Sequence, residues 1–290
     1  MSSGQAEPAV CVSTRVEPDA GDGPVAEHWQ GPLGEGLVYS RRAPGWAEAN
    51  EDRAGCWQLG QDALVLAVAD GAGGHATGGQ AADLALDGMA EALAELGAGE
   101  GGAAAALLAG FDRANRRVMS LRTGAATTLA AVLVEGRMVR TFHSGDSQAL
   151  VTGQRGKIRL LTTAHSPVGY AVEAGVLDQR EAIHHDERHL VSNLVGAPDM
   201  HIEVSAPVRL QTRDTVVVAS DGLFDNLQVG EVVEFARIGP LTAAAERLAA
   251  RCRQRMEEPG ESEPSKVDDV TFILYRLAGA AAGAAAERSI

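Results

Sequence analysis

Acidic residues follow apolar runs at two similar points of this 290-residue chain. The run at 64–69 ends at Asp70-Gly71, and the run at 215–219 leads through one serine into Asp221-Gly222. Carboxylates at the ends of different strands can meet in one cleft, where their mutual repulsion requires a cation between them. Oxygen ligands favour hard ions such as Mg²⁺ or Mn²⁺. The pattern therefore suggests a divalent metal centre.

Three further acidic positions stand beside predicted strands. The segment HSGDSQ carries Asp146 between two strands, and the Asp268-Asp269 pair directly precedes the apolar run at 270–275. Glu51 and Asp52 stand in ANEDR, ahead of another strand. Two divalent ions a few ångströms apart could hold a water molecule, lower its pKa and polarise a phosphate oxygen. The chemistry expected is hydrolysis of a phosphate ester.

Glycine is concentrated after the first of these aspartates, in DGAGGHATGG at 70–79. Glycine allows the backbone to adopt unusual dihedral angles or to approach a ligand closely. Asp-Gly is also a common turn dipeptide, so a simple turn is the alternative interpretation of this segment on its own.

The periodicity predicts the elements that position these residues. Apolar residues at helical spacing predict helices at 83–96, 107–118, 228–238 and 241–258, with irregular helical structure at 168–188. Alternating short runs between 127 and 162 predict an antiparallel meander, and further strands are expected at 201–210, 214–222 and 269–277. Strands with helices on both flanks indicate an α+β layered domain.

Composition excludes several classes of protein. The net charge of −14 argues against nucleic-acid binding, which uses basic surfaces. Three scattered cysteines fit neither a disulfide framework nor a zinc knuckle. No apolar stretch reaches membrane-spanning length and no signal peptide is recognisable, so we expect a cytoplasmic protein. Residues 1–30 and 279–290 are predicted to be flexible tails around one domain at 31–278.

The order of these motifs resembles the bacterial branch of the type-2C, metal-dependent serine/threonine protein phosphatases. The resemblance extends from Gly36 to Leu277 and depends on NEDR, VADGAGGH, TTLAAVLV, HSGDSQAL, TTAHS, VASDGLFDN and VDDVTFILY. It implies an α+β fold in which a central β-sandwich of two antiparallel sheets has helices on both outer faces. The metals would lie in a cleft at one end.

The resemblance also implies roles for individual residues. Asp70 would bridge two Mn²⁺ or Mg²⁺ ions, and the Gly71 carbonyl would join the second. Asp221 and Asp268 would complete the first metal site, and Glu51 would reach the second. A third, weaker ion would lie at Asp146, while Asp52 and Asp269 would stand just outside the ligands.

The implied reaction is hydrolysis of phosphoserine or phosphothreonine in a phosphorylated protein. A metal-bridged water would attack phosphorus in line without a phospho-enzyme, so catalysis would consist mainly of positioning and charge neutralisation. The expected partner is a cognate serine/threonine kinase or its targets. Asp70 and Asp221 are the acidic residues on which the chemistry would depend most.

Two positions depart from the family pattern. The usual phosphate-binding arginine is replaced by Ala47, which leaves Arg41, Arg42 or Arg53 as substitutes. A histidine found in eukaryotic members is replaced by Ala72. His75 could serve as the general acid in its place, or could be a structural or surface histidine.

Other interpretations remain open on the sequence alone. His184, His185 and His189 could form a zinc site, or they could belong to a mobile flap over the substrate. A haloacid-dehalogenase-type phosphatase would need an Asp-x-Asp motif, which VADGAGG lacks. A non-catalytic binding module that kept the phosphatase fold is the alternative function, and Ala47 is the feature that favours it.

Overall fold

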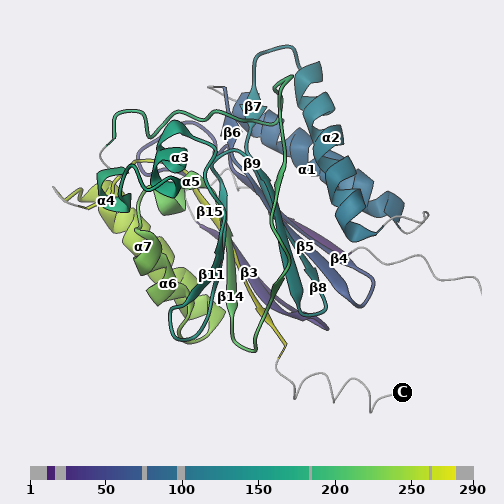
Figure 1. The fold of residues 1–290 in the computed structure, drawn as a ribbon. Coiled ribbons are helices and arrows are strands. Elements are labelled where there is room, and N and C mark those ends of the chain that lie inside the picture. Colours follow the sequence, from purple (N-terminus) through teal and green to yellow (C-terminus); the bar gives the residue numbers. More distant parts are fainter. Residues whose placement is uncertain are drawn as a thin grey trace, which may run out of the picture.

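The computed structural model describes residues 12–16, 24–73, 77–96, 102–182, 185–260 and 263–278. Two antiparallel sheets pack face to face and helices cover both outer faces (Figure 1). This α-β-β-α sandwich confirms the predicted fold class.

The first sheet has the strand order β1-β4-β5-β8-β9-β12, with β13 also paired to β9. Its strands are β1 (Val12–Val16), β4 (Arg53–Leu59), β5 (Ala63–Ala69), β8 (Leu129–Glu135), β9 (Met138–Ser144), β12 (Glu203–Val204) and β13 (Val208–Arg209). A small ladder of β6 (Gly71–Ala72) and β7 (Ala126–Thr127) continues beyond the end of β5.

The second sheet has the strand order β11-β10-β14-β15-β3-β2. Its strands are β2 (Val25–Gly31), β3 (Gly34–Arg41), β10 (Gln148–Thr152), β11 (Ile158–Leu161), β14 (Thr215–Ala219) and β15 (Val270–Leu277). The chain passes from the first sheet to the second between β9 and β10, at residues 145–147.

The central strands are apolar on both faces because both faces are buried. On β5, Leu64, Leu66 and Val68 face the other sheet. Val65, Ala67 and Ala69 of the same strand face the helices. This period-2 alternation explains why a strand buried on both sides reads as an unbroken apolar run that ends at the first polar residue.

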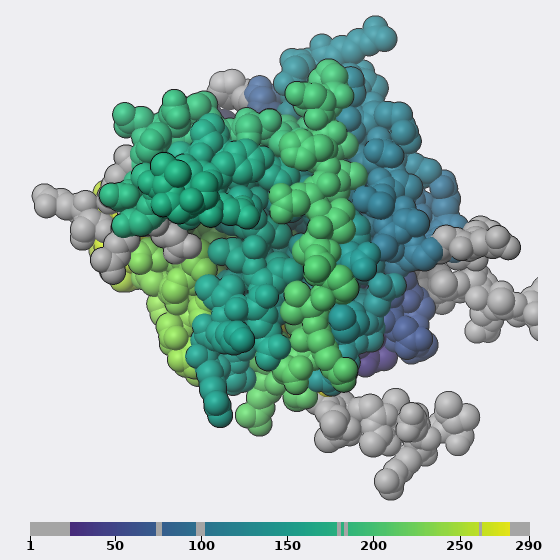
Figure 2. All heavy atoms as spheres, in the orientation of Figure 1, coloured from purple at the N-terminus to yellow at the C-terminus, as the bar shows by residue number. Residues whose placement is uncertain are grey.

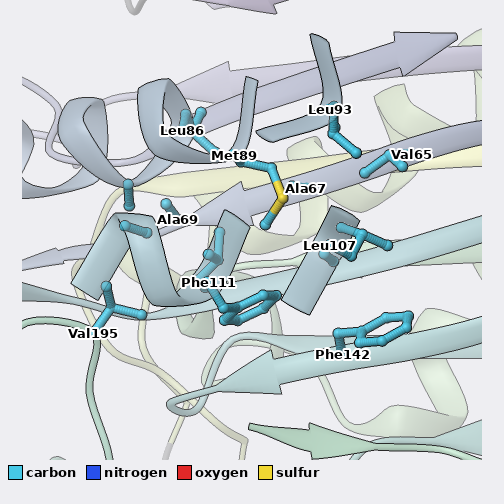
Figure 3. Packing of buried hydrophobic residues seen from close by; sticks show 14 of the residues in the cluster. Val65, Ala67, Ala69, Leu86, Met89, Leu93, Leu107, Phe111, Phe142 and Val195 are labelled. Carbon is cyan, nitrogen blue, oxygen red and sulfur yellow. The ribbon is translucent and has the colours of Figure 1, made fainter. Parts of the chain in front are cut away.

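Two helical layers close the sandwich. Helices α1 (Thr77–Glu95) and α2 (Ala103–Ser120) cover the first sheet, where Met89 and Phe111 pack over β5 (Figure 3). Helices α5 (Asp221–Phe224), α6 (Val229–Ala236) and α7 (Leu241–Glu257) cover the second sheet. Helices α3 (Pro167–Glu173) and α4 (Gln179–Ala182) lie in the long connection between β11 and β12. None of the helices in the described ranges has the length and apolar character needed to cross a membrane.

Two expectations from the sequence differ from the structure. Residues 1–30 were expected to form a tail, but β1 pairs with β4 and β2 pairs with β3 at the sheet edges. Edge strands gain backbone hydrogen bonds on one side and need no strong apolar pattern, so the sequence signal is weak. The strands at 127–161 do not form one meander, because β8–β9 and β10–β11 belong to different sheets.

Candidate metal centre

Several partly buried carboxylates meet where strands of the two sheets end. Asp70 follows β5, Asp221 follows β14 and begins α5, and Asp268 stands two residues before β15. Asp70 is close enough to Asp221, Asp268 and Asp146 for their charges to act on it. The strand ends bring these residues together as the sequence predicts.

The backbone of Asp70 is fixed by two threonines. The Thr128 amide donates to the Asp70 carbonyl at 2.8 Å, and the Thr127 hydroxyl donates to the same oxygen at 2.8 Å. The Asp70 amide donates to Thr128 Oγ1 at 3.0 Å. These bonds fix the Asp70 backbone without using its carboxylate oxygens.

Burial and mutual repulsion disfavour the ionised form of the carboxyl groups in this cluster. The pKa of Asp70 is raised well above its usual range, first by burial and then by Asp52, Asp221, Asp268 and Asp146. Burial and neighbouring carboxylates also raise the pKa of Asp146 to about 8 and that of Asp268 to about 7. Groups that resist ionisation in this way become stable anions when a cation joins them. The donor set is all oxygen, which fits Mg²⁺ or Mn²⁺.

A lysine ammonium stands among these carboxylates. Lys266 Nζ lies 2.9 Å from Asp268 Oδ2, 3.2 Å from Asp225 Oδ2, and in direct contact with Asp221 Oδ2. Burial and the carboxylates of Asp221, Asp225 and Asp268 act on Lys266 in opposite directions, and the net result is a pKa above its usual range. A cation therefore already neutralises the part of the cluster expected to hold the first metal ion.

The residues beside the predicted ligands hold them in place. Asp269 Oδ2 accepts from the Glu51 amide at 2.7 Å, and Asp269 Oδ1 accepts from the Ala43 amide at 2.8 Å. The Ser220 hydroxyl donates to Asp52 Oδ2 at 2.7 Å. Asp52 and Asp269 thus tie the Glu51 segment to the ends of β14 and β15, as expected for residues just outside the ligand set.

Gly71, Gly78 and Gly222 stand where a larger residue would clash with its neighbours. A Cβ on Gly71 would lie 2.2 Å from the Gly78 carbonyl in α1, and one on Gly78 would lie 2.8 Å from the Glu51 carboxylate. A Cβ on Gly222 would lie 1.8 Å from the Asp269 carbonyl oxygen. Glycine at these positions lets a helix and a strand end approach the acidic residues closely.

A cavity of about 450 Å³ adjoins the cluster. Asp146, Asp221 and Asp225 line one end, and Val168 and Val172 of α3 contribute to its apolar wall. Figure 2 shows the teal residues of the connection that contains α3 and α4 at the upper left of this face. A phosphorylated side chain could enter the cluster through this cavity.

The arginines considered for phosphate binding have different surroundings. The guanidinium of Arg53 has a structural role. It pairs with both carboxylate oxygens of Asp83 and donates to the Asn50 and Asp52 carbonyls. Arg41 and Arg42 line a small cavity that also contains Asp268. Sequence reasoning missed Arg188, which lines the large cavity, acts on Asp225 and donates to the Ser265 carbonyl at 2.9 Å.

The histidine hypotheses have separate outcomes. His75 and His184 lie outside the described residues. His185 and His189 are exposed and join no group of three metal-ligating side chains within the described ranges. The His143, His165 and Glu203 side chains do approach one another, a cluster that the sequence analysis did not identify.

Comparisons with known proteins agree with this geometry. The sequence profile described as Protein phosphatase 2C matches residues 47–258. The serine/threonine phosphatase stp of Listeria welshimeri is 29% identical over 185 residues, which are 60% of this chain and 72% of that protein.

Two solved structures share the fold. The serine/threonine phosphatase PstP/Ppp of Mycobacterium tuberculosis superposes with a TM-score of 0.69 at 25% identity, covering 84% of this chain and 98% of that one. The catalytic domain of PstP in complex with two manganese ions gives a TM-score of 0.65 at 24% identity, covering 89% and 100%. The resemblance seen in the motifs is confirmed, and the chain belongs to the protein phosphatase 2C family.

Proposed function

We propose that this chain hydrolyses phosphoserine and phosphothreonine in proteins with the help of divalent metal ions. The observation that carries the proposal is the convergence of carboxylates from separate strand ends in one largely desolvated cluster. Membership of the protein phosphatase 2C family supports the same reaction.

Each predicted ligand has an assigned task in this proposal. Asp70, Asp221 and Asp268 would hold the first ion, and Asp70, Glu51 and the Gly71 carbonyl would hold the second. Asp146 would hold a third, weaker ion. When bound, the ions supply a water of lowered pKa and polarise the phosphoryl oxygens. Mn²⁺ and Mg²⁺ both suit the oxygen donors.

The protein's own contribution is positioning. Thr127 and Thr128 hold the Asp70 backbone, and Asp269 holds the Glu51 amide. The cluster is largely buried, so water is partly excluded and charges act strongly on one another. Substrate binding in a site already arranged for the reaction avoids reorganisation during the chemical step.

The substrate approaches past the connection that contains α3 and α4. The cavity beside Asp146 and Asp221 suits a phosphorylated side chain, and Arg188 places a guanidinium at its edge. A guanidinium can bind a phosphate through two hydrogen bonds, so Arg188 joins Arg41 and Arg42 as candidates for the role absent at Ala47. We propose a cytoplasmic enzyme acting on a cognate kinase or its targets.

The proposal is tested by turnover of a phosphothreonine peptide and of p-nitrophenyl phosphate. The assay compares Mn²⁺, Mg²⁺ and chelator, with Asp70→Asn and Asp221→Asn beside the wild type. Asp62→Asn is the matched control, because Asp62 is an exposed residue in the turn before β5. Metal-dependent turnover lost in both site variants and kept in the control supports the proposal. No turnover from folded wild type with any metal would favour the binding-module alternative.

A further inference from the structure

Lys266 is an unusual residue for this chain. Only two lysines occur in the sequence, Lys157 and Lys266, and the second points its ammonium into the acidic cluster. Its side chain is one-quarter exposed, so water reaches part of it. Composition alone gives no reason for a lysine at this position.

The backbone of Lys266 is fixed by hydrogen bonds, while its ammonium is held only by the carboxylates of the cluster. The Lys266 amide donates to Asn226 Oδ1 at 3.0 Å, and Asn226 Nδ2 donates to the Lys266 carbonyl at 2.8 Å. Asn226 Nδ2 also donates to the Gly222 carbonyl at 2.9 Å, which ties this loop to α5. Four methylenes separate the fixed backbone from the ammonium, so the charged group can move without unfolding the loop.

The ammonium contacts the same carboxylates that the first metal ion would need. Asp221 and Asp268 are the predicted ligands of that ion, and both direct an oxygen at Lys266 Nζ. A monovalent and a divalent cation held by the same oxygens repel each other strongly in a buried site. The two cations therefore cannot both occupy this position.

The spacing of the carboxylates favours the ammonium over a small metal ion. Within the described residues, no three carboxylates of this cluster bring one oxygen each within 4.8 Å of one another. Ligand distances of about 2.1 Å for Mg²⁺ require a tighter arrangement. A divalent ion would have to draw the carboxylates inward as the ammonium leaves.

We propose that Lys266 and the first divalent ion bind the carboxylates of Asp221 and Asp268 as alternatives to each other. Metal binding there is an exchange, in which the ammonium leaves and the ion enters. The inference rests on the proposed function for the identity of the ion. It goes beyond that function by assigning Lys266 as the residue that controls metal affinity at the first site.

The test is calorimetric titration of metal-free protein with Mn²⁺. Lys266→Met keeps the length of the side chain and removes the competing charge, so the tightest Mn²⁺ binding should strengthen about tenfold. Lys266→Arg keeps the charge and should bind no more tightly than the wild type. Lys157→Met is the matched control, since Lys157 is exposed between β10 and β11, and should leave the affinity unchanged.

Thermal unfolding provides a second readout that does not depend on catalysis. In chelator, Lys266→Met should unfold at a lower temperature than the wild type, because the carboxylates lose their only contacting ammonium within the described residues. Saturating Mn²⁺ should remove or reverse the difference. A melting difference of equal size with and without metal would contradict the exchange.

The outcomes separate this inference from the proposed function. Unchanged or weaker Mn²⁺ binding by Lys266→Met, with a wild type that binds Mn²⁺ and turns over substrate, overturns the exchange alone. Absence of Mn²⁺ binding by the wild type and by Lys266→Met would overturn both. Tighter binding by Lys266→Met, with Lys157→Met unchanged, supports the exchange whatever the turnover rate.

Discussion

Two polar clusters that each contain buried titratable side chains lie close together in this molecule, and burial affects those side chains in opposite ways. The acidic cluster consists of Asp70, Asp146, Asp221, Asp225 and Asp268 with Lys266. The histidine cluster consists of His143, His165, His201, Asn193 and Glu203. The Gly145 amide, one residue before Asp146, donates to His165 Nδ1 at 3.2 Å and joins the two.

Three of the four ring nitrogens of His143 and His165 have hydrogen-bond partners, and His143 Nδ1 is buried without one. Asn193 Nδ2 bonds His165 Nδ1 at 2.8 Å, and His143 Nε2 bonds the Thr163 carbonyl at 2.8 Å. Burial lowers the pKa of His143, and burial together with His143 lowers that of His165 to about 4. Both rings are therefore neutral at pH 7, and a neutral ring with hydrogen-bond partners is stable in the interior.

Stacking also argues against metal binding by the histidine cluster. The His143 and His165 rings stack with centroids 4.3 Å apart and an interplanar angle of 26°. Imidazole lone pairs lie in the ring plane, so two rings stacked in this way cannot both direct a nitrogen at one ion. Burial leaves histidines in a neutral structural form but leaves carboxylates in need of a cation.

The largest expected effect separates the clusters by activity. Asp70→Asn should reduce kcat on the order of a thousandfold, because the variant lacks the charge that we propose joins the two metal ions. His165→Asn keeps an acceptor near the position of Nδ1 and should retain most of the activity. Steady-state kinetics of both variants in Mn²⁺ provide the check. Equal losses would show that the two clusters act as one catalytic unit.

The pH dependence of stability should have opposite signs for the two clusters. The folded pKa of Asp146 is about 8 against an ordinary value of 3.8, so the folded protein binds more protons than the unfolded chain between these values. Metal-free stability therefore falls as pH rises from about 4 to about 8, by an amount on the order of a few kcal/mol. Denaturant unfolding in chelator should show this loss, and Asp146→Asn or Mn²⁺ should reduce it.

The histidines oppose this trend in acid. The folded pKa of His165 is about 4 against an ordinary value of 6.5, so the unfolded chain binds more protons in this window. Their contribution to stability is complete above pH 6.5 and is lost as pH falls toward 4. Unfolding of the Mn²⁺-loaded wild type should show this acid loss, and His165→Asn should flatten it. An identical pH profile in both proteins would show that His165 does not cause the loss of stability in acid.

A smaller effect concerns the hydrogen bonds between the clusters. His165→Gln places its amide near the position of Nε2 and leaves the Gly145 amide without its acceptor, which should cost about 1–3 kcal/mol of unfolding free energy. His165→Asn should cost less. If both substitutions destabilise the protein equally in urea, the bond from Gly145 does not position the Asp146 turn.

The smallest expected effect is on substrate affinity. Ala47→Arg should lower KM for a phosphothreonine peptide several-fold, because a guanidinium can donate two hydrogen bonds to one phosphate. Arg188→Met in the native chain should raise KM if Arg188 already serves the phosphate. An unchanged KM in Ala47→Arg, together with a raised KM in Arg188→Met, would assign phosphate binding to Arg188.

The convergence of Asp70, Asp221 and Asp268 could be predicted from the sequence because each is tied to a local pattern. Asp70, Asp221 and Asp268 stand at the boundaries of strands buried on both faces, where apolar runs stop or start. Antiparallel pairing of β14 with β15 then brings the last two together. Strand-end position is a local property, so this part of the site was predictable.

Residues that depend on tertiary contacts were not predictable in the same way. Lys266 and Arg188 meet the acidic cluster through loops with no periodic signal. The partner of Arg53 is Asp83, thirty residues away on α1, so Arg53 could not be excluded as a phosphate ligand before the structure. The one available signal for Lys266 was the presence of a rare lysine two residues before Asp268.

The most direct measurement is anomalous scattering from crystals soaked in Mn²⁺, compared with crystals kept in chelator. Two manganese peaks bounded by Asp70, Asp221 and Asp268, with the Lys266 ammonium moved away from Asp221, are the predicted result. A Lys266 ammonium still in contact with Asp221 and Asp268, and no manganese peak beside them, would contradict the metal centre on which this account depends.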